Sequence, residues 1–155
     1  MEFSELICKE FIIPEFKGRT KKQILEELVE CVAFKKSDVN KDDLLKALLE
    51  REKLGSTGIG DGVAIPHGKL NGLDNIILLF GKSSEGIDFD AIDAKPVTLV
   101  FLLVAPADSA GLHLKALARL SRMLREKDFK SNLLSESDQQ SLLRIIIDKD
   151  KTLSA

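Results

Sequence analysis

The 155-residue sequence has no tryptophan and no tyrosine, and it has only two cysteines and two histidines. Cys8 and Cys31 belong to no C-x-x-C pair, so the sequence offers no zinc-binding motif. We expect two free thiols that pack as small apolar side chains in a reducing compartment, rather than a disulfide. No metal ion and no cofactor is expected.

Long apolar runs are also missing. The longest, Val97–Ala105, is interrupted by Thr98 and is far shorter than the roughly 20 residues that cross a bilayer. The first residues, MEFSELICKEF, carry acidic side chains and lack the long apolar core of a secretory signal. We therefore expect a cytoplasmic protein that does not insert into a membrane.

An excess of basic charge is absent too. Lys and Arg number 23 against 25 Asp and Glu, and the formal net charge is −2 at pH 7, so nothing indicates nucleic acid as a partner. Hydrophobic residues make up 44% and charged residues 31%, as in ordinary folded proteins. Because the sequence has no repeats or linker-like segments, residues 1–155 are expected to form a single domain.

Helices are predicted near both ends of the sequence. Thr20 and Gln23 form a capping box that precedes apolar residues at helical spacing. A second helix is expected to begin after Asn40 and to end before Gly55, with Arg51 in its last turn. A third is expected over 112–127, and a fourth after the capping box of residues 137–140. The residues expected to face the core are Ile24, Leu25, Leu28, Val29, Val32, Leu44, Leu45, Leu48, Leu49, Leu117, Leu120, Leu124, Leu142, Leu143 and Ile146.

The middle of the chain is predicted to form strands. Ile76–Phe80 and Val97–Val104 are continuous apolar runs bounded by Asn, Gly and Pro, which is typical of central strands covered on both faces. Val63–Ile65 is a short strand candidate that ends at Pro66, and Gly86–Ile92 is a candidate edge segment. Together these elements predict an α/β fold with a mixed, parallel and antiparallel, central sheet sandwiched by helices.

The segment Gly55–Gly68, GSTGIGDGVAIPHG, holds five of the ten glycines and one of the two histidines. Its spacing matches neither the P-loop G-x-x-x-x-G-K-[ST] nor the dinucleotide motif G-x-G-x-x-G. It also follows a predicted helix and leads into a strand, whereas both nucleotide motifs follow a strand and open a helix. Glycines nevertheless permit positive φ and bare backbone, so successive N–H groups can converge on an anion.

His67 lies near the end of this segment, between Pro66 and Gly68, which give the ring a rigid mount with space beside it. A neutral imidazole has one free lone pair near pH 7 and can attack phosphorus directly, which gives a phosphohistidine. Loop amides, Arg51 and a second donor could stabilise the transferred charge. The residues alone leave an alternative open, a turn histidine whose ring is bonded to the backbone.

The same segment resembles the active-site signature of enzyme IIA, fructose/mannitol type, of the phosphoenolpyruvate-dependent sugar phosphotransferase system. The features that match are the glycine-rich stretch, the Ala-Ile-Pro-His-Gly core and the upstream Leu49–Leu54 segment. Similarity continues through Phe89–Val97, Leu103–Asp108 and His113–Leu114, so it covers nearly the whole chain. Gly-Lys-Leu after His67, and Phe-Asp-Ala-Ile-Asp, are typical of the nitrogen-regulatory branch.

The resemblance implies the enzyme IIA fructose/mannitol-type fold and roles for several residues. His67 matches the histidine that attacks, through Nε2, a phosphoryl group held by the histidine-containing phosphocarrier HPr or its nitrogen-branch counterpart. His113 matches the second active-site histidine, an N–H donor to the phosphoryl oxygens, and Arg51 matches the phosphate-facing arginine. Further phosphate-binding residues are expected to be Ser56, Thr57, Gly58 and Gly68.

Several of these residues also have simpler explanations. The hydroxyls at 56 and 57 could equally be solvated or capping. By residue type alone, His113 could be a solvated histidine at a helix start and Arg51 a cation that suits a helix end.

Asp61 replaces the Asn often found in nitrogen-regulatory members, and a carboxylate that points inward would weaken phosphoryl binding. A solvated face is favoured over partner steering for Lys115, Arg119, Arg122 and Lys130. Turn and cap roles are expected for Asp88, Asp90 and Asp93.

The leading hypothesis is a stand-alone enzyme IIA of the nitrogen-regulatory type. It would be a phosphotransferase that carries a phosphoryl group on His67 and signals through its phosphorylation state to a regulatory target, such as a potassium transporter or a sensor kinase. An alternative is a fructose or mannitol enzyme IIA that passes the group to a separate IIB protein for sugar uptake. A further alternative is a regulatory binding module that is not phosphorylated. The sequence given holds no IIB or membrane IIC segment.

Overall fold

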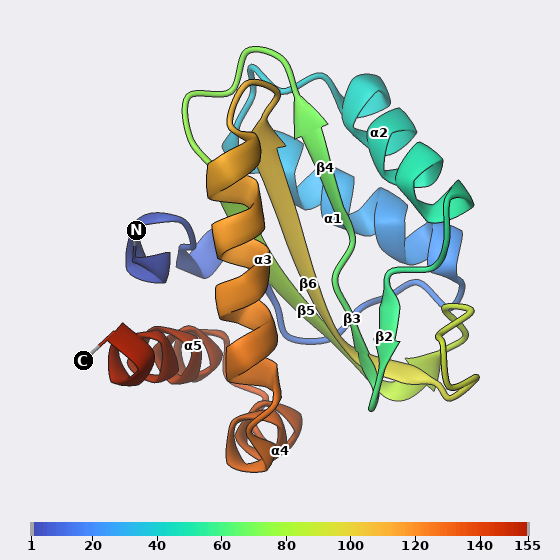
Figure 1. The fold of residues 1–155 in the computed structure, drawn as a ribbon. Coiled ribbons are helices and arrows are strands. Elements are labelled where there is room, and N and C mark those ends of the chain that lie inside the picture. Colours follow the sequence, from blue (N-terminus) through green and yellow to red (C-terminus); the bar gives the residue numbers. More distant parts are fainter. Residues whose placement is uncertain (1, 155) are drawn as a thin grey trace.

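The computed structural model describes residues 2–154 (Figure 1). Its helices are α1 (Lys21–Lys35), α2 (Lys41–Lys53), α3 (Ala110–Leu124), α4 (Lys127–Ser135) and α5 (Gln139–Ser154), preceded by the 3-10 helices η1 (Phe3–Glu5) and η2 (Lys9–Phe11). Its strands are β1 (Ile12–Ile13), β2 (Gly58–Gly60), β3 (Val63–Ala64), β4 (His67–Leu70), β5 (Ile77–Ile87) and β6 (Val97–Pro106).

The strands form a mixed sheet of six strands within the described part of the chain. Strand β6 lies between β5, which runs antiparallel to it, and β3 and β4, which both run parallel to it. β3 and β4 follow one another along the same edge of β6, with His67 at the start of β4 opposite Leu103. β1 pairs parallel to β5, and β2 pairs antiparallel to β3. The predicted mixed sheet is therefore confirmed.

Helices cover both faces of this sheet. In Figure 1, α1 lies behind the sheet and α3 in front of it, with α4 and α5 beside the lower end of α3. Helix α2 packs against α1 and β4, and α3 packs against β6. Strand β4 is therefore flanked by α2, and α3 lies on the neighbouring strand β6.

Local sequence sets the first two helix starts as predicted. The Thr20 Oγ1 atom accepts the N–H of Gln23 at 3.2 Å, and Asn40 Oδ1 accepts the N–H of Asp43 at 3.0 Å. The apolar residues predicted to face the core are buried in all but three positions. The three exceptions, which are half-buried, are Leu45, Leu49 and Leu117.

The glycine-rich segment forms a hairpin rather than an open loop. Strand β2 pairs with β3 around Asp61 and Gly62, whose φ angles are 55° and 79°. Two-residue hairpin turns require positive φ at such positions, and an Asp-Gly pair adopts it at low cost. Part of the glycine content therefore serves the turn.

Several elements differ from the prediction, among them strands β1 and β4, which were not predicted. Strand β5 continues to Ile87, which pairs with Val97, so the expected separate edge segment at 86–92 is wrong. The third helix ends at Leu124, because the backbone of Glu126 is extended (ψ 120°) and interrupts it. A separate helix, α4, begins after Glu126 and was not predicted. The N-terminal cap of α5 comes from Asp138, whose carboxylate accepts the N–H of Ser141 at 2.9 Å.

Candidate functional site

The backbone next to His67 fixes the orientation of its ring. Its Nδ1 atom lies 2.8 Å from the carbonyl oxygen of Ile65, just before the start of β4. Because a carbonyl oxygen only accepts hydrogen bonds, Nδ1 carries the proton in the neutral ring and the lone pair lies on Nε2. The turn-histidine alternative and the nucleophile hypothesis are therefore compatible. Nδ1 is bonded to the backbone, as the first requires, and Nε2 keeps the lone pair that the second requires.

Arg51 reaches that second nitrogen from the last turn of α2. Its Nε–H donates to Nε2 of His67 at 3.2 Å, and its Nη1 donates to the carbonyl oxygen of Gly55 at 2.7 Å. The bond to Gly55 satisfies a carbonyl just beyond the helix C-terminus, where cations are favourable. The guanidinium is therefore held beside the imidazole by the end of its own helix.

His113 contacts the same ring from the first turn of α3. The two imidazole centroids are 5.2 Å apart with an interplanar angle of 60°, which is an edge-on contact. His113 is only 6% exposed, and its Nδ1 atom is buried without a hydrogen-bond partner. The structure thus brings together the three residues predicted to be catalytic, from α2, β4 and α3.

Both imidazoles are disposed to be neutral at pH 7. Burial lowers the pKa of His67 below its ordinary value, and the Arg51 charge lowers it further, against the opposing effect of the Ile65 carbonyl. Burial, together with the neighbouring His67 and Lys69, lowers the pKa of His113 to about 4. A neutral His67 keeps its Nε2 lone pair over a wider pH range than a solvated histidine would.

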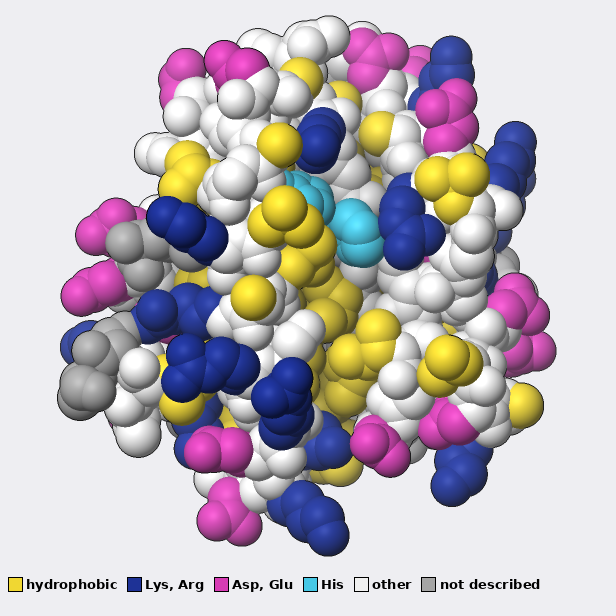
Figure 2. All heavy atoms as spheres, viewed as in Figure 1, with side chains coloured by type: hydrophobic (Ala, Val, Ile, Leu, Met, Phe, Trp, Pro, Cys, Tyr) yellow, Lys and Arg dark blue, Asp and Glu magenta, His cyan; other side chains and the backbone are white. Residues whose placement is uncertain are grey.

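A cavity of about 640 Å³ opens beside these residues. Its polar lining comes from Arg51, His67, Lys69, Glu50 and His113, and its apolar lining comes from α2 and α3. Figure 2 shows the two histidines side by side in a hollow, with hydrophobic side chains next to them and basic side chains close by. A cavity with apolar walls and converging N–H donors is suited to a small anionic group.

Gly68, which was predicted to bind phosphate, is part of the cavity lining. A Cβ at this position would lie 3.5 Å from the side chains of Ala47 and Leu48, which is an ordinary packing distance. Helix α2 therefore lies directly against β4 at Gly68, close to the contact between Arg51 and His67.

Ser56, Thr57 and Gly58 are not brought to this cavity. The Ser56 hydroxyl donates to the Phe89 carbonyl at 2.5 Å and accepts the N–H of Gly58 at 3.0 Å. Thr57 is buried and donates its hydroxyl and its N–H to the carboxylate of Glu52. These groups fasten the hairpin to its neighbours, which agrees with the capping alternative for the two hydroxyls.

Two residues near the site were missed by the sequence reasoning. Glu52 is almost fully buried, binds Thr57, and forms an ion pair with Lys21 at 2.8 Å. Lys69 lines the cavity two residues after His67. Alternation along a strand could have identified Lys69, since residues two apart share a face, whereas the partners of Glu52 come from distant segments.

The other charged residues that drew attention lie outside the cavity. Asp61 is exposed in the hairpin turn and donates its N–H to Asp93 at 3.0 Å, so its carboxylate is not among the cavity-lining groups. Arg119 forms an ion pair with the buried Asp150. Residues 2–154 contain no cluster of acidic, histidine or cysteine side chains that could hold a metal ion.

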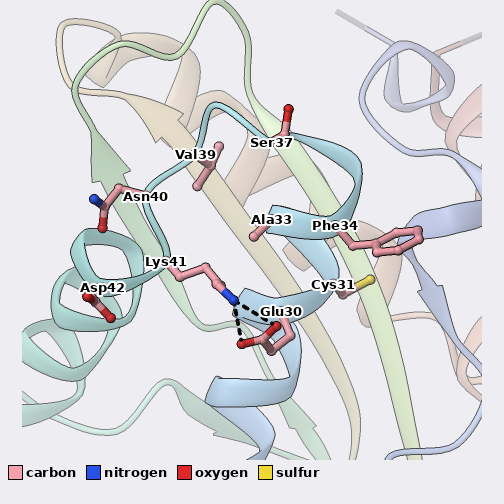
Figure 3. Close-up of a pocket in the computed structure, with 9 residues that line it drawn as sticks. All are labelled: Glu30, Cys31, Ala33, Phe34, Ser37, Val39, Asn40, Lys41 and Asp42. Carbon is pink, nitrogen blue, oxygen red and sulfur yellow. Dashed lines mark hydrogen bonds and ion pairs between the residues drawn. The ribbon is translucent and has the colours of Figure 1, made fainter.

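A larger hollow of about 740 Å³ lies between the end of α1 and the start of α2 (Figure 3). The side chains there do not converge on a common point: Glu30 pairs with Lys41 at 3.3 Å, while Cys31 and Phe34 point away from Asn40. Cys8 and Cys31 are both free thiols, as predicted. None of the described helices is long and apolar enough to span a membrane.

The fold and the site together define a class of protein, a mixed-sheet α/β domain that presents a neutral histidine and an arginine to a cavity at the edge of its sheet. The family described as "Phosphoenolpyruvate-dependent sugar phosphotransferase system, EIIA 2" matches residues 5–149. The chain belongs to this family of phosphotransferase carrier domains.

Individual relatives point mainly to the nitrogen-regulatory branch. The nitrogen regulatory protein of Bradyrhizobium diazoefficiens is 43% identical over 146 residues, which cover 94% of this chain and 95% of that protein. The crystal structure of nitrogen regulatory protein IIA-Ntr from Neisseria meningitidis superposes with a TM-score of 0.87 at 33% identity, covering 93% of this chain and 98% of that one.

Sugar-specific proteins are similar as well. The fructose-specific EIIABC component of Bacillus subtilis is 35% identical over 152 residues, which cover 97% of this chain but 24% of that protein. The enzyme IIAMTL chain in its complex with phosphorylated enzyme IIBMTL from Escherichia coli has a TM-score of 0.76 at 22% identity, covering 92% of this chain and 97% of that one. The second similarity shows a shared fold.

Proposed function

We propose that this protein accepts a phosphoryl group on Nε2 of His67 and passes it on. The observation that carries this proposal is the bond from Nδ1–H to the Ile65 carbonyl, which leaves the Nε2 lone pair beside Arg51 and the cavity. In the forward step, that lone pair forms the new N–P bond while the bond from phosphorus to the donor histidine breaks. The released electron pair returns to the donor imidazole, so neither a metal nor an external base is required.

Arg51 and His113 would stabilise the phosphoryl group from two sides. The guanidinium is permanently charged and can turn its N–H groups from Nε2 of His67 to phosphoryl oxygens. Since a buried N–H without an acceptor is rarer than an unpaired lone pair, we assign the His113 proton to Nε2 and the lone pair to the orphaned Nδ1. His113 would then offer one N–H donor at the cavity.

The donor would be an HPr-type phosphocarrier, and the phosphorylation state would act as a regulatory signal. Support for a nitrogen-regulatory role comes from the relatives named as nitrogen regulatory proteins. The regulated target that we propose is a potassium transporter or a sensor kinase. We assign the role to a single cytoplasmic domain of residues 1–155. Its first and last residues lie outside the described part of the chain.

The principal alternative is a fructose or mannitol enzyme IIA that phosphorylates a separate IIB protein. It is favoured by the similarity to fructose-specific components, one of which covers 97% of this chain. Transfer from the phosphorylated protein to a purified sugar-specific IIB would support this alternative. Failure with a panel of active IIB proteins would count against it.

Intact-mass spectrometry tests the proposal directly. The protein is incubated with phosphoenolpyruvate, enzyme I and an HPr-type carrier, and we expect one acid-labile phosphoryl adduct on the wild type. The His67→Ala variant should show none, whereas His113→Ala should still accept the group, more slowly or with a changed lifetime. Absence of an adduct on the wild type, with donors shown to be active, would leave only the non-phosphorylated binding module.

A further inference from the structure

Lys69 is exposed to solvent, but it also lines the cavity beside His67. It follows His67 by two residues on β4, and the two pair with Ala105 and Leu103 of β6. Residues two apart on a strand point to the same face and lie about 7 Å apart. Gly68, between them, turns the opposite way toward Ala47 and Leu48 of α2. His67 and Lys69 therefore share one face of the strand and line the same cavity.

Without Lys69, the positive charge that lines the cavity is too small to balance the negative charge of a phosphoryl group. Such a group carries between one and a half and two negative charges near neutral pH, on the order of a phosphoserine. Arg51 supplies one positive charge, but Glu50 lines the same cavity with a negative one. His113 is buried and contributes no full charge while it is neutral. Lys69 supplies the second cation within reach of the group.

The ammonium of Lys69 is also uncommitted. Within residues 2–154 it makes no ion pair, in contrast to Lys21, whose charge is taken by Glu52. Its charge already acts on the site, because it contributes to the lowered pKa of His113. A four-carbon stem lets an exposed lysine turn toward a new anion at little cost.

We infer that Lys69 is a phosphate-positioning residue, whose ammonium turns to the phosphoryl group on His67 and stabilises its dianionic form. This inference rests on the proposed function, because it needs a phosphoryl group at His67. It adds a third residue to the arginine and the second histidine, and it gives the lysine a role in the phosphorylated state rather than in the free protein.

Phosphorus-31 NMR of the phosphorylated full chain tests this role. Four proteins are compared: wild type, Lys69→Gln, Lys69→Arg, and Lys36→Gln as a control. Lys36 is exposed at the end of α1 and lines a different hollow, so its variant makes the same change of net charge elsewhere. We expect Lys69→Gln to raise the pKa of the phosphoryl group by about half a pH unit at low salt. Lys69→Arg and Lys36→Gln should match the wild type.

The rate of phosphorylation gives a second measurement. For Lys69→Gln we expect a roughly threefold to tenfold decrease that shrinks at high salt, because screening weakens interactions between exposed charges. An unchanged phosphoryl pKa in Lys69→Gln would overturn the inference. If the rate were slower while the pKa stayed unchanged, the inference would still be overturned, and Lys69 would instead contact the donor protein. A wild type that takes up no phosphate would instead refute the proposed function.

Discussion

One backbone carbonyl decides which nitrogen of His67 is available for chemistry. Ile65 holds Nδ1–H at 2.8 Å, so the reactive Nε2 points to the guanidinium of Arg51. In the free protein Arg51 therefore occupies the place where phosphorus must arrive. Burial lowers the pKa of His67 and the Arg51 charge lowers it further, which keeps the nucleophile unprotonated. Arg51 thus both maintains the lone pair and must shift when the phosphoryl group enters.

Replacement of Arg51 separates these effects. In Arg51→Gln we expect the pKa of His67 to rise toward its ordinary value, because a nearby positive charge is lost. Phosphorylation should slow by about 10- to 100-fold, the range expected for loss of a hydrogen bond from a charged group. NMR titration of the His67 ring protons and a timed mass assay measure the two effects. Arg51→Lys keeps the charge but loses the planar fork, so its His67 pKa should remain low while its rate falls. A His67 pKa that falls or stays constant in Arg51→Gln would contradict this account.

His113 links the site to the stability of the fold. Its pKa is about 4 in the folded protein and near its ordinary value in the unfolded chain. Between these two values the unfolded chain binds more protons, so acidification from pH 6.5 toward pH 4 removes stability, with no effect at higher pH. Urea unfolding at pH 7 and pH 5 should therefore show a larger loss for the wild type than for His113→Gln. Equal losses in the two proteins would show that His113 is not held neutral by the fold.

The β2–β3 hairpin is a structural element in this account. Its turn places Gly62 at φ 79°, where a side chain is strained and a Cβ would lie 3.2 Å from Thr98 Oγ1. Gly62→Ala should lower the free energy of unfolding by about 1–2 kcal/mol. The phosphorylation rate should be nearly unchanged, because the turn does not line the cavity.

Gly111 supplies the matched control. It lies in α3 with no atom near the position of an added Cβ, so Gly111→Ala should not destabilise the fold and should add about 0.5–1 kcal/mol from helix propensity. Urea denaturation measures both variants. If Gly62→Ala were as stable as the wild type but unable to accept phosphate, the hairpin would belong to the chemical site instead.

Elements with strong local signals could be predicted from the sequence. The caps at Thr20 and Asn40 and the apolar runs of β5 and β6 specify their own structure. The break between α3 and α4 could not be foreseen, because no glycine or proline marks Glu126. Likewise, Arg51, His67 and His113 were identified individually, but their contacts depend on how α2 packs against β4 and α3 against the neighbouring strand β6. The binding partners of Ser56 and Thr57 are tertiary and gave no local signal.

The two ends of the chain are tied together on the side of the sheet that carries α3. The carboxylate of Asp150 in α5 accepts the N–H of Phe3 at 2.8 Å and pairs with Arg119 of α3. The Arg119 guanidinium also lies over the Phe3 ring, 5.6 Å from its centre. Since α3 carries His113, this cluster helps to fix the helix that presents the second histidine.

Asp150→Ala should therefore destabilise the whole molecule by about 3 kcal/mol, because it removes the carboxylate from its ion pair with the partly buried Arg119 and takes away the side-chain acceptor of the Phe3 N–H. The control is Asp148→Ala, an exposed position two residues earlier on the same helix, which should change stability by less than about 0.5 kcal/mol. Thermal and urea unfolding provide the measurement. Similar losses in both variants would show that the Asp150 cluster does not hold the two ends together.

The central claim is that His67 receives the phosphoryl group on Nε2. The most direct measurement is a long-range proton–nitrogen NMR correlation of the phosphorylated protein, labelled with nitrogen-15 in its histidine rings. We predict that phosphorus coupling appears on Nε2 of His67, while Nδ1 keeps its proton and its bond to Ile65. Coupling on Nδ1 of His67, or on either nitrogen of His113, would contradict the account.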